Sequence, residues 1–270
     1  MLRHINFSHE NLCRCPNSQN LERMEISMDS ALFKQAVDTV IDHEKNDIGI
    51  GTLGEKTVHA VLKNYLSPDS SCHEIKIKNY YADIYSEDGI IEIQTGNFNK
   101  LRKKLSVFLE ITKVTIVYPI PSTKYLRWVN VDTGEVSPPR KSPKKGTPYM
   151  VFPELYKIKD FLNHPNLKLH IILLDLEEYK LLDGWSKDKK KGATKSDKIP
   201  LAIANEVHIH NISDYEKLIP DTLSKTFTSR DYKKESGLYK AHANIALNVL
   251  HSIGALNRIG KEGRYYIYSK

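Results

Sequence analysis

The chain has 270 residues, 40% of them hydrophobic and 27% charged, and its formal net charge is +7. This composition is typical of a soluble globular protein with one or two domains, and the positive charge favours a polyanionic partner. No apolar run approaches the roughly 18 residues of a membrane span, and the N-terminus lacks the apolar stretch of a signal peptide, so no membrane partner is expected.

Residues 1–29 are polar and irregular, and we expect them to form a mobile tail. The tail contains potential zinc ligands, but their spacing matches no standard zinc finger, so a zinc site is the weaker interpretation. These residues are His4, His9, Cys13 and Cys15. The three cysteines of the chain make no disulfide framework, so a reducing cytoplasm is the expected compartment.

Two helices and a strand are predicted next. Residues 31–47 carry apolar side chains at helical spacing, and a second helix begins near residue 51 and runs to about residue 66. In its first turn, Thr52 and Glu55 have the spacing of a capping box. Capping and a metal-site role both remain open for Glu55. Residues 73–78 alternate and predict a strand.

A β-hairpin is predicted over residues 82–94, with the turn at residues 86–89. Because side chains alternate along a strand, Glu92 and Gln94 share one face. A carboxylate on a strand flanked by buried isoleucines needs compensation, and the hairpin brings Asp83 close to Glu92 and Gln94. Two carboxylates and an amide oxygen near one point form a ligand set that suits Mg²⁺.

A helix and a strand follow the hairpin. Residues 97–110 have an apolar stripe at helical spacing, and the first half of this helix is basic, with Lys103 and Lys104 about two turns from Gln94. A solvated basic face is the simplest interpretation of these lysines. Residues 114–120 are apolar and β-rich and end at proline, which predicts a central strand.

These residues resemble the signature of the PD-(D/E)XK nuclease superfamily: an Asp, then Glu-x-Lys on the following strand, within an α-β-β-β-α-β core. Asp83, Glu92 and Gln94 occupy the signature positions, and Glu55 matches the acidic residue often found on the first helix. The resemblance covers less than a third of the chain. It departs from the family in two places, because no Pro precedes Asp83 and Gln94 replaces the usual Lys.

The resemblance implies a restriction-endonuclease-like α/β fold and a metal-dependent nuclease site. Asp83 and Glu92 would hold Mg²⁺, with Mn²⁺ able to substitute, and the Gln94 side chain or the Ile93 carbonyl would complete the shell. Lys104 is the candidate replacement for the missing lysine, because some members carry that lysine on this helix. The candidate catalytic residues are Glu55, Asp83, Glu92, Gln94 and Lys104.

The second half of the chain alternates elements with basic segments. We expect strands at residues 124–131 and 167–174 and helices at residues 154–162 and 177–182. Residues 138–148 are too rich in Pro and Gly for a helix or strand, and they and residues 187–198 are predicted as basic loops. These are either phosphate-tracking loops or solvated linkers. Their candidate nucleic-acid contacts are Lys144, Lys145, Lys189, Lys190 and Lys191.

The C-terminal residues predict a separate module. Helices are expected at residues 220–227, 228–236 and 238–253, with a turn at Gly237 and a closing hairpin made by residues 254–258 and 265–268. This order is that of a winged helix-turn-helix, which binds DNA or serves protein contact. The side chains expected to reach DNA are Tyr239, Lys240, His242, Asn244 and Asn248 on the long helix, and Lys261 and Arg264 on the wing.

The sequence thus predicts three parts: the tail at residues 1–29, a PD-(D/E)XK-like nuclease domain with a basic extension at residues 30–200, and a winged-helix module at residues 201–270. The predicted function is Mg²⁺-dependent phosphodiester hydrolysis in DNA, for genome defence or DNA processing. A homodimer remains open. The alternative is a catalytically inactive nuclease-fold protein that binds DNA or has a regulatory role.

Overall fold

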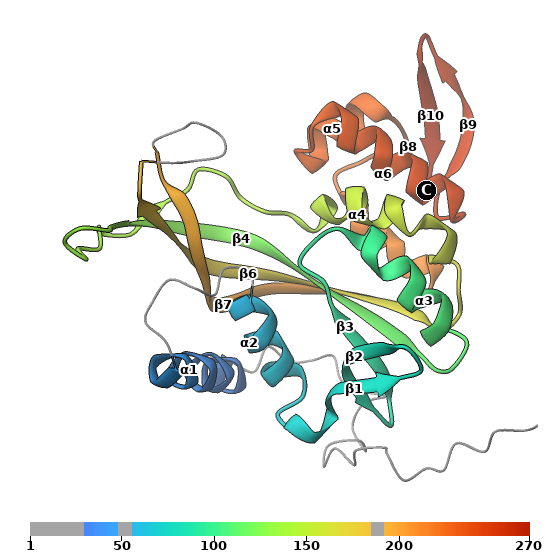
Figure 1. Ribbon diagram of the computed structural model, residues 1–270. Coiled ribbons are helices and arrows are strands. Elements are labelled where there is room, and N and C mark those ends of the chain that lie inside the picture. The colour runs from blue at the N-terminus through green and yellow to red at the C-terminus, as the bar shows by residue number, and fades with distance from the viewer. Residues whose placement is uncertain (1–29, 48–55, 185–191) are drawn as a thin grey trace, which may run out of the picture.

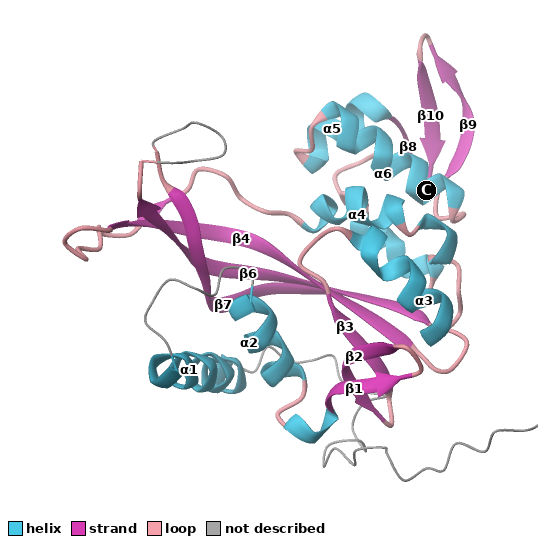
Figure 2. Cartoon of the chain, viewed as in Figure 1, coloured by secondary structure: helices cyan, strands magenta, loops and turns pink. Residues whose placement is uncertain are grey.

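The computed structural model describes residues 30–47, 56–184 and 192–270 as a mixed α/β protein (Figures 1 and 2). A large mixed sheet lies between helices, and a smaller C-terminal part carries its own three-stranded sheet. No helix in these ranges is long and apolar enough to cross a membrane. Several sequence predictions concern residues outside these ranges: the tail with its potential zinc ligands, Glu55, and Lys189, Lys190 and Lys191.

The α-helices are α1 (Ser30–Asp47), α2 (Lys56–Leu66), α3 (Arg102–Phe108), α4 (Phe152–Lys157), α5 (Ser229–Ser236) and α6 (Lys240–Ser252). The strands are β1 (His73–Ile77), β2 (Tyr80–Ser86), β3 (Gly89–Ile93), β4 (Val114–Asn130), β5 (Arg140–Lys141), β6 (Leu167–Leu182), β7 (Thr194–Ile209), β8 (Thr226–Thr228), β9 (Asn257–Glu262) and β10 (Tyr265–Ser269). Short 3₁₀ segments are η3 (Ser70–Cys72), η4 (Phe98–Leu101), η5 (Pro148–Val151), η6 (Lys159–Phe161) and η7 (Ile212–Leu218).

Within the described residues the large sheet has the strand order β1-β2-β3-β4-β6-β7, with β5 beside β4. The strands from β1 to β3 are antiparallel, β4 is parallel to both β3 and β6, and β7 is antiparallel to β6. A parallel pair needs a crossover connection, so α3 lies between β3 and β4 in the chain and α4 between β4 and β6. The predicted order of helix, three strands, helix and strand is therefore observed from α2 to β4.

Two groups of buried side chains cover the two faces of the sheet. Ile116 and Ile171 belong to the group that includes residues of α3 and α4. Their neighbours along the strands, Val117 and Ile172, belong to the group that includes residues of α1 and α2. Because successive residues of a strand point to opposite faces, the central strands are apolar almost continuously. The sheet is thus enclosed by two helix layers.

The predicted hairpin is formed by β2 and β3. Gly89 closes it with φ of +119°, and a Cβ atom at this position would lie 2.5 Å from the Lys113 carbonyl oxygen, so only glycine fits. The β2–β3 pairing ends at Ile84 and Ile91, whereas β3 continues to pair with β4 as far as Ile93. The two strands therefore diverge, and we call this point the strand fork.

Strand β4 passes through the prolines that were expected to end it. The predicted strand at residues 124–131 is largely its second half, reached through a register shift after Pro121. The Val117 carbonyl of β4 accepts a hydrogen bond from the Gln94 N–H, just after the end of β3. Pro119 and Pro121 lie two and four residues later, so their backbone nitrogens face the same side as Val117, where β3 has already ended. The missing N–H groups therefore cost no ladder bond.

Three further predictions in this half are wrong. Residues 177–182 are strand rather than helix, because β6 pairs with β4 on one side and β7 on the other, and this pairing overrides local propensity. Of the predicted loop at residues 187–198, the part from Thr194 onward lies in β7. In the predicted loop at residues 138–148, Arg140–Lys141 pairs with β4 as β5.

The predicted domain boundary at residue 200 falls inside β7, which stays in the large sheet until Ile209. After this strand come η7, β8, α5, α6 and the hairpin β9–β10, with the small sheet in the order β8-β10-β9. The helix expected at residues 220–227 is wrong, because Thr226–Thr228 pairs with β10 as β8. The predicted start of the next helix is correct: Thr228 caps α5 in a capping box with Asp231.

The C-terminal segment shares its core with the large sheet. Helices α4 and α6 pack together (Figure 1), and one continuous group of buried side chains includes Ile116 in the sheet, Phe152 in α4 and Leu247 in α6. Residues 210–270 are therefore a segment docked on the sheet through apolar contacts, and cutting them away would expose this surface.

We expect Phe152→Ala to lower the free energy of unfolding by about 3–5 kcal/mol, because the ring is fully buried in the shared core. Urea titration followed by circular dichroism measures this loss, and the wild type should unfold in one transition. Met150→Ala is the matched control: Met150 is 39% exposed, so its effect should stay within about 0.5 kcal/mol. Equal effects of the two substitutions would contradict the shared core.

Candidate active site

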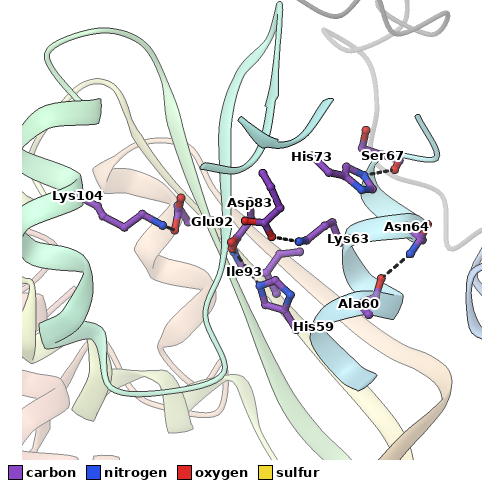
Figure 3. Close-up of polar contacts among 11 residues, drawn as sticks. His59, Ala60, Lys63, Asn64, Ser67, His73, Asp83, Glu92, Ile93 and Lys104 are labelled. Atoms are coloured by element: carbon purple, nitrogen blue, oxygen red, sulfur yellow. Dashed lines mark hydrogen bonds and ion pairs between the residues drawn. The ribbon is translucent and has the colours of Figure 1, made fainter. Parts of the chain in front are cut away.

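The strand fork positions the first carboxylate. The Ile93 N–H points toward β2, but β2 has left the ladder, so the Asp83 side chain takes the place of a strand partner. Asp83 Oδ2 accepts this N–H at 2.7 Å (Figure 3). A buried backbone N–H without an acceptor is costly, so this bond fixes the carboxylate at the fork.

Glu92 lies next to the fork, and its side chain is only 2% exposed. Lys104 of α3 donates to Glu92 Oε2 at 2.7 Å. The other carboxylate oxygen, Oε1, is buried and has no hydrogen-bond partner among the described residues. The sequence therefore predicted the correct lysine beside Glu92, and the structure adds an unsatisfied oxygen that no sequence pattern indicates.

His59 of α2 is a site residue that the sequence analysis missed. Its Nε2 lies 3.2 Å from Asp83 Oδ2, and its side chain is 28% exposed. The available signal was its position four residues after Glu55 in the sequence, which is the spacing of one turn in the predicted helix. Asp83 is thus contacted from the helix layer of α2, and Glu92 from the layer of α3. The two carboxylates are therefore contacted from opposite helix layers, yet Asp83 lies close enough for its charge to raise the pKa of Glu92.

The two carboxyl groups differ in their pKa. Burial and the negative charge of Asp83 raise the pKa of Glu92 to about 7, against the opposing effect of Lys104. Burial also disfavours ionised Asp83, but the hydrogen bond and charge of His59 and the bond from Ile93 outweigh it and lower the pKa of Asp83. Near neutral pH, Asp83 is ionised and Glu92 is divided between its two forms.

This donor set fits a divalent cation. Glu92 Oε1 is buried without a partner, and Asp83 and Glu92 repel each other unless a positive charge lies close to both. Hard carboxylate oxygens are the ligands that Mg²⁺ prefers. Gln94, the expected third ligand, donates from its side-chain amide nitrogen to the Gly96 carbonyl. This contact ties Gln94 to the turn that follows β3.

The predicted nucleic-acid contacts that the structure describes lie mostly at the surface. Tyr239 is 73% exposed at the start of α6, and His242 is half-buried with its ring edge-on to Tyr239. The exposed lysine, asparagine and arginine positions of this set are Lys144, Lys145, Lys240, Asn244, Lys261 and Arg264. Asn248 differs from prediction: it accepts from Lys159 Nζ at 3.5 Å and so faces the sheet domain rather than solvent.

Basic and aromatic side chains alternate around the β9–β10 hairpin. Arg230 and Arg264 lie 5.0 and 5.2 Å from the ring centre of Tyr265. Arg258 lies 4.5 Å from the ring centre of Tyr266. The sequence analysis missed Arg230 and Arg258, because each reaches an aromatic ring on another element. Cation–π contacts of this kind hold arginines in extended positions at the surface.

Comparison with known proteins adds a family. Residues 56–210 match the family described as a domain of unknown function, DUF8091. The chain belongs to this family. The match begins with α2 and ends just after β7, so the DUF8091 region covers the strand fork and the rest of the large sheet. An uncharacterized protein of Treponema pallidum (strain Nichols) is 29% identical over 222 residues, which are 82% of this chain and 87% of that protein. No solved structure matches the chain at a significant level.

The raised pKa of Glu92 predicts a pH-dependent stability. The Glu92 carboxyl group keeps its proton up to about pH 7 in the folded state, but only up to about pH 4.5 in the unfolded state. The contribution of this proton to the free energy of unfolding is therefore lost as the pH rises from about 4.5 to about 7. At about 1.4 kcal/mol per pH unit, Glu92→Gln should gain about 3 kcal/mol of stability relative to wild type between pH 4.5 and pH 8. Urea titrations at both pH values, with chelator present, measure the difference.

The matched control is Glu110→Gln, since Glu110 is exposed at the end of the same helical region. Its stability difference from wild type should stay nearly constant across the same pH range. If the stability difference between Glu92→Gln and wild type also stays constant with pH, the folded protein does not raise the pKa of Glu92.

Proposed function

We propose that this chain is a metal-dependent deoxyribonuclease of the PD-(D/E)XK type, with its active site at the strand fork. The observation that carries the proposal is the Asp83 carboxylate held at the fork close enough for its charge to act on Glu92, with Lys104 bound to Glu92 and a buried Glu92 oxygen left without a partner among the described residues. The order of elements from α2 to β4 supports it, because it matches the α-β-β-β-α-β core of that superfamily.

Asp83 and Glu92 would hold Mg²⁺, and the Ile93 carbonyl or the Gln94 side chain would complete the protein's share of the shell. When bound, Mg²⁺ supplies a water of lowered pKa and stabilises negative charge that develops on the scissile phosphate. Asp83 meets this role already ionised. Glu92 gives up its proton more readily once a positive charge lies beside it, because repulsion from Asp83 is then compensated.

The chain's own residues supply the remaining positions. Lys104 brings an ammonium group to the site from α3, with its side chain 22% exposed, and can hold a water or a phosphate oxygen where the family uses the lysine of Glu-x-Lys. His59 is a positioning residue, because its Nε2 contacts Asp83 Oδ2, the same oxygen that accepts the Ile93 N–H. Asp83, His59 and Lys104 are all partly exposed, so a phosphate can approach the fork.

We expect Asp83→Asn and Glu92→Gln to lower DNA cleavage with Mg²⁺ or Mn²⁺ by about 100-fold or more, and Lys104→Ala to lower it by a smaller factor. Gln94→Lys should preserve or raise activity, because it restores the family's usual residue. The assay is cleavage of single-stranded, duplex and branched DNA with each metal and with chelator. Asp88→Asn, in the exposed turn of the same hairpin, should cleave like wild type.

Two outcomes would remove the enzyme proposal. If wild type and Glu92→Gln cleave equally under every condition, the activity is a contaminant. If the wild type binds DNA but never cleaves it, the catalytically inactive alternative replaces the nuclease. Retained folding of Glu92→Gln, checked by circular dichroism, keeps the comparison valid.

We also propose that the C-terminal segment is a winged helix that binds DNA. Its support is the order of α5, a left-handed turn at Gly237, α6 and the hairpin β9–β10. The exposed N-terminal turn of α6 and the basic hairpin lie on this segment (Figure 1). In such a module the helix reaches base edges, and the hairpin contacts phosphates.

Lys261→Ala and Arg264→Ala should each weaken binding to labelled duplex DNA. Each should also lower the slope of log affinity against log salt by about 1, because one phosphate contact is lost. Fluorescence anisotropy at several salt concentrations measures both quantities. Lys78→Ala is the control, since Lys78 is exposed in the turn after β1, in the sheet domain. Unchanged affinity and slope in both hairpin variants would mean that the hairpin serves another partner.

A further inference from the structure

A second cluster of metal-binding side chains lies on β6 and β7, away from the strand fork. His170 pairs directly with His208 across the two strands, and Glu206 precedes His208 by two residues, so all three side chains point to one face of the sheet. Their ligand atoms lie within 4.8 Å of one another. Glu206 Oε2 is 2.7 Å from His170 Nε2 and 3.5 Å from His208 Nε2.

The cluster is buried at its base and open at one side. The side chains of His170 and Glu206 are 4% and 5% exposed, whereas that of His208 is 24% exposed. The rings of His170 and His208 stack with centroids 4.1 Å apart, so their nitrogens reach the same carboxylate. The partial exposure of His208 gives an ion a path from solvent.

One atom of the cluster has no hydrogen-bond partner. Glu206 Oε2 is contacted by both histidines, but Glu206 Oε1 is buried and has no hydrogen-bond partner among the described residues. Buried polar atoms normally have a partner, and a metal ion beside this carboxylate would supply one.

We propose that His170, Glu206 and His208 bind Zn²⁺, or a divalent ion of similar ligand preference, at a site separate from the strand fork. Two imidazole nitrogens and one carboxylate oxygen form a ligand set that suits zinc, with a fourth position left for water. Mg²⁺ prefers oxygen ligands alone, so the two sites select different ions. The zinc would join β6 to β7 just before the chain leaves the sheet for the C-terminal segment.

The location also separates this site from the proposed nuclease site. Across the sheet, Ile93 pairs with Val117, Val117 with His170, and His170 with His208. His170 is therefore two strands away from Ile93, or about 10 Å at the usual strand spacing. The proposal does not depend on cleavage activity.

The test uses the full chain in a background of Asp83→Asn, which removes one carboxylate of the other candidate site for divalent ions. The protein is dialysed against Zn²⁺, freed of excess ion, and assayed for bound zinc. About one zinc per chain is expected in the background and in His210→Ala. His208→Ala should retain none, and Glu206→Gln should bind at least about tenfold more weakly.

His210→Ala is the matched control. His210 lies on the same face two residues beyond His208, and its ring stacks on His208 with centroids 5.9 Å apart, but it is not part of the cluster. A second readout is the thermal unfolding temperature. Zn²⁺ should raise it in the background and in His210→Ala, but not in His208→Ala.

Absence of bound zinc in the background would overturn the proposal, as would equal zinc retention in His208→Ala. In the first case the cluster is a metal-free hydrogen-bonded pair of histidines around Glu206. If Glu206→Gln fails to fold, His208→Ala decides the matter alone, because its partly exposed ring can be removed at little structural cost. These results are independent of the proposed nuclease activity, because zinc content and unfolding temperature are measured in variants that all lack the Asp83 carboxylate.

Discussion

The hydrogen bond from the Ile93 N–H to the Asp83 carboxylate is the contact on which the candidate site depends. Strands β2 and β3 separate at this point, and the separation leaves a buried backbone donor without a strand partner. The carboxylate satisfies that donor and is held beside Glu92 as a result. The same bond stabilises the end of β3 and holds Asp83 where its charge acts on Glu92, so local structure and chemistry share one cause.

Among the described residues, two buried glutamates carry an oxygen without a hydrogen-bond partner, Glu92 and Glu206. Their surroundings differ in a way that chemistry can distinguish. Glu92 has the Asp83 carboxylate in its surroundings, and carboxylate oxygens favour a hard cation. Glu206 has two imidazole rings, which favour zinc. In both places, the sheet holds an acidic side chain with one buried oxygen that lacks a hydrogen-bond partner among the described residues.

The C-terminal segment is joined to the sheet by a continuous apolar core rather than by a linker. Helix α6 packs on α4, and α4 lies in the connection between two central strands. A basic hairpin on this segment therefore has a fixed position relative to the strand fork. If DNA binds there, the geometry of the core limits which phosphate can reach Asp83 and Glu92.

The sequence by itself determined the local features. The turn that ends at Gly89, the alternation that sets Glu92, the start of α5 and the basic face that carries Lys104 all follow from residues close in the chain, where periodicity and turn chemistry act directly. The order of elements from α2 to β4 was predictable for the same reason.

Only the tertiary structure decided the rest. Residues 177–182 became strand because two neighbours pair with them, and His59 reached Asp83 because α2 packs at the strand fork. His170 and Glu206 are 36 residues apart in the chain, and nothing local links them. Such contacts depend on which distant strands pair and in which register, and that choice is made by burial of the whole sheet rather than by any short segment.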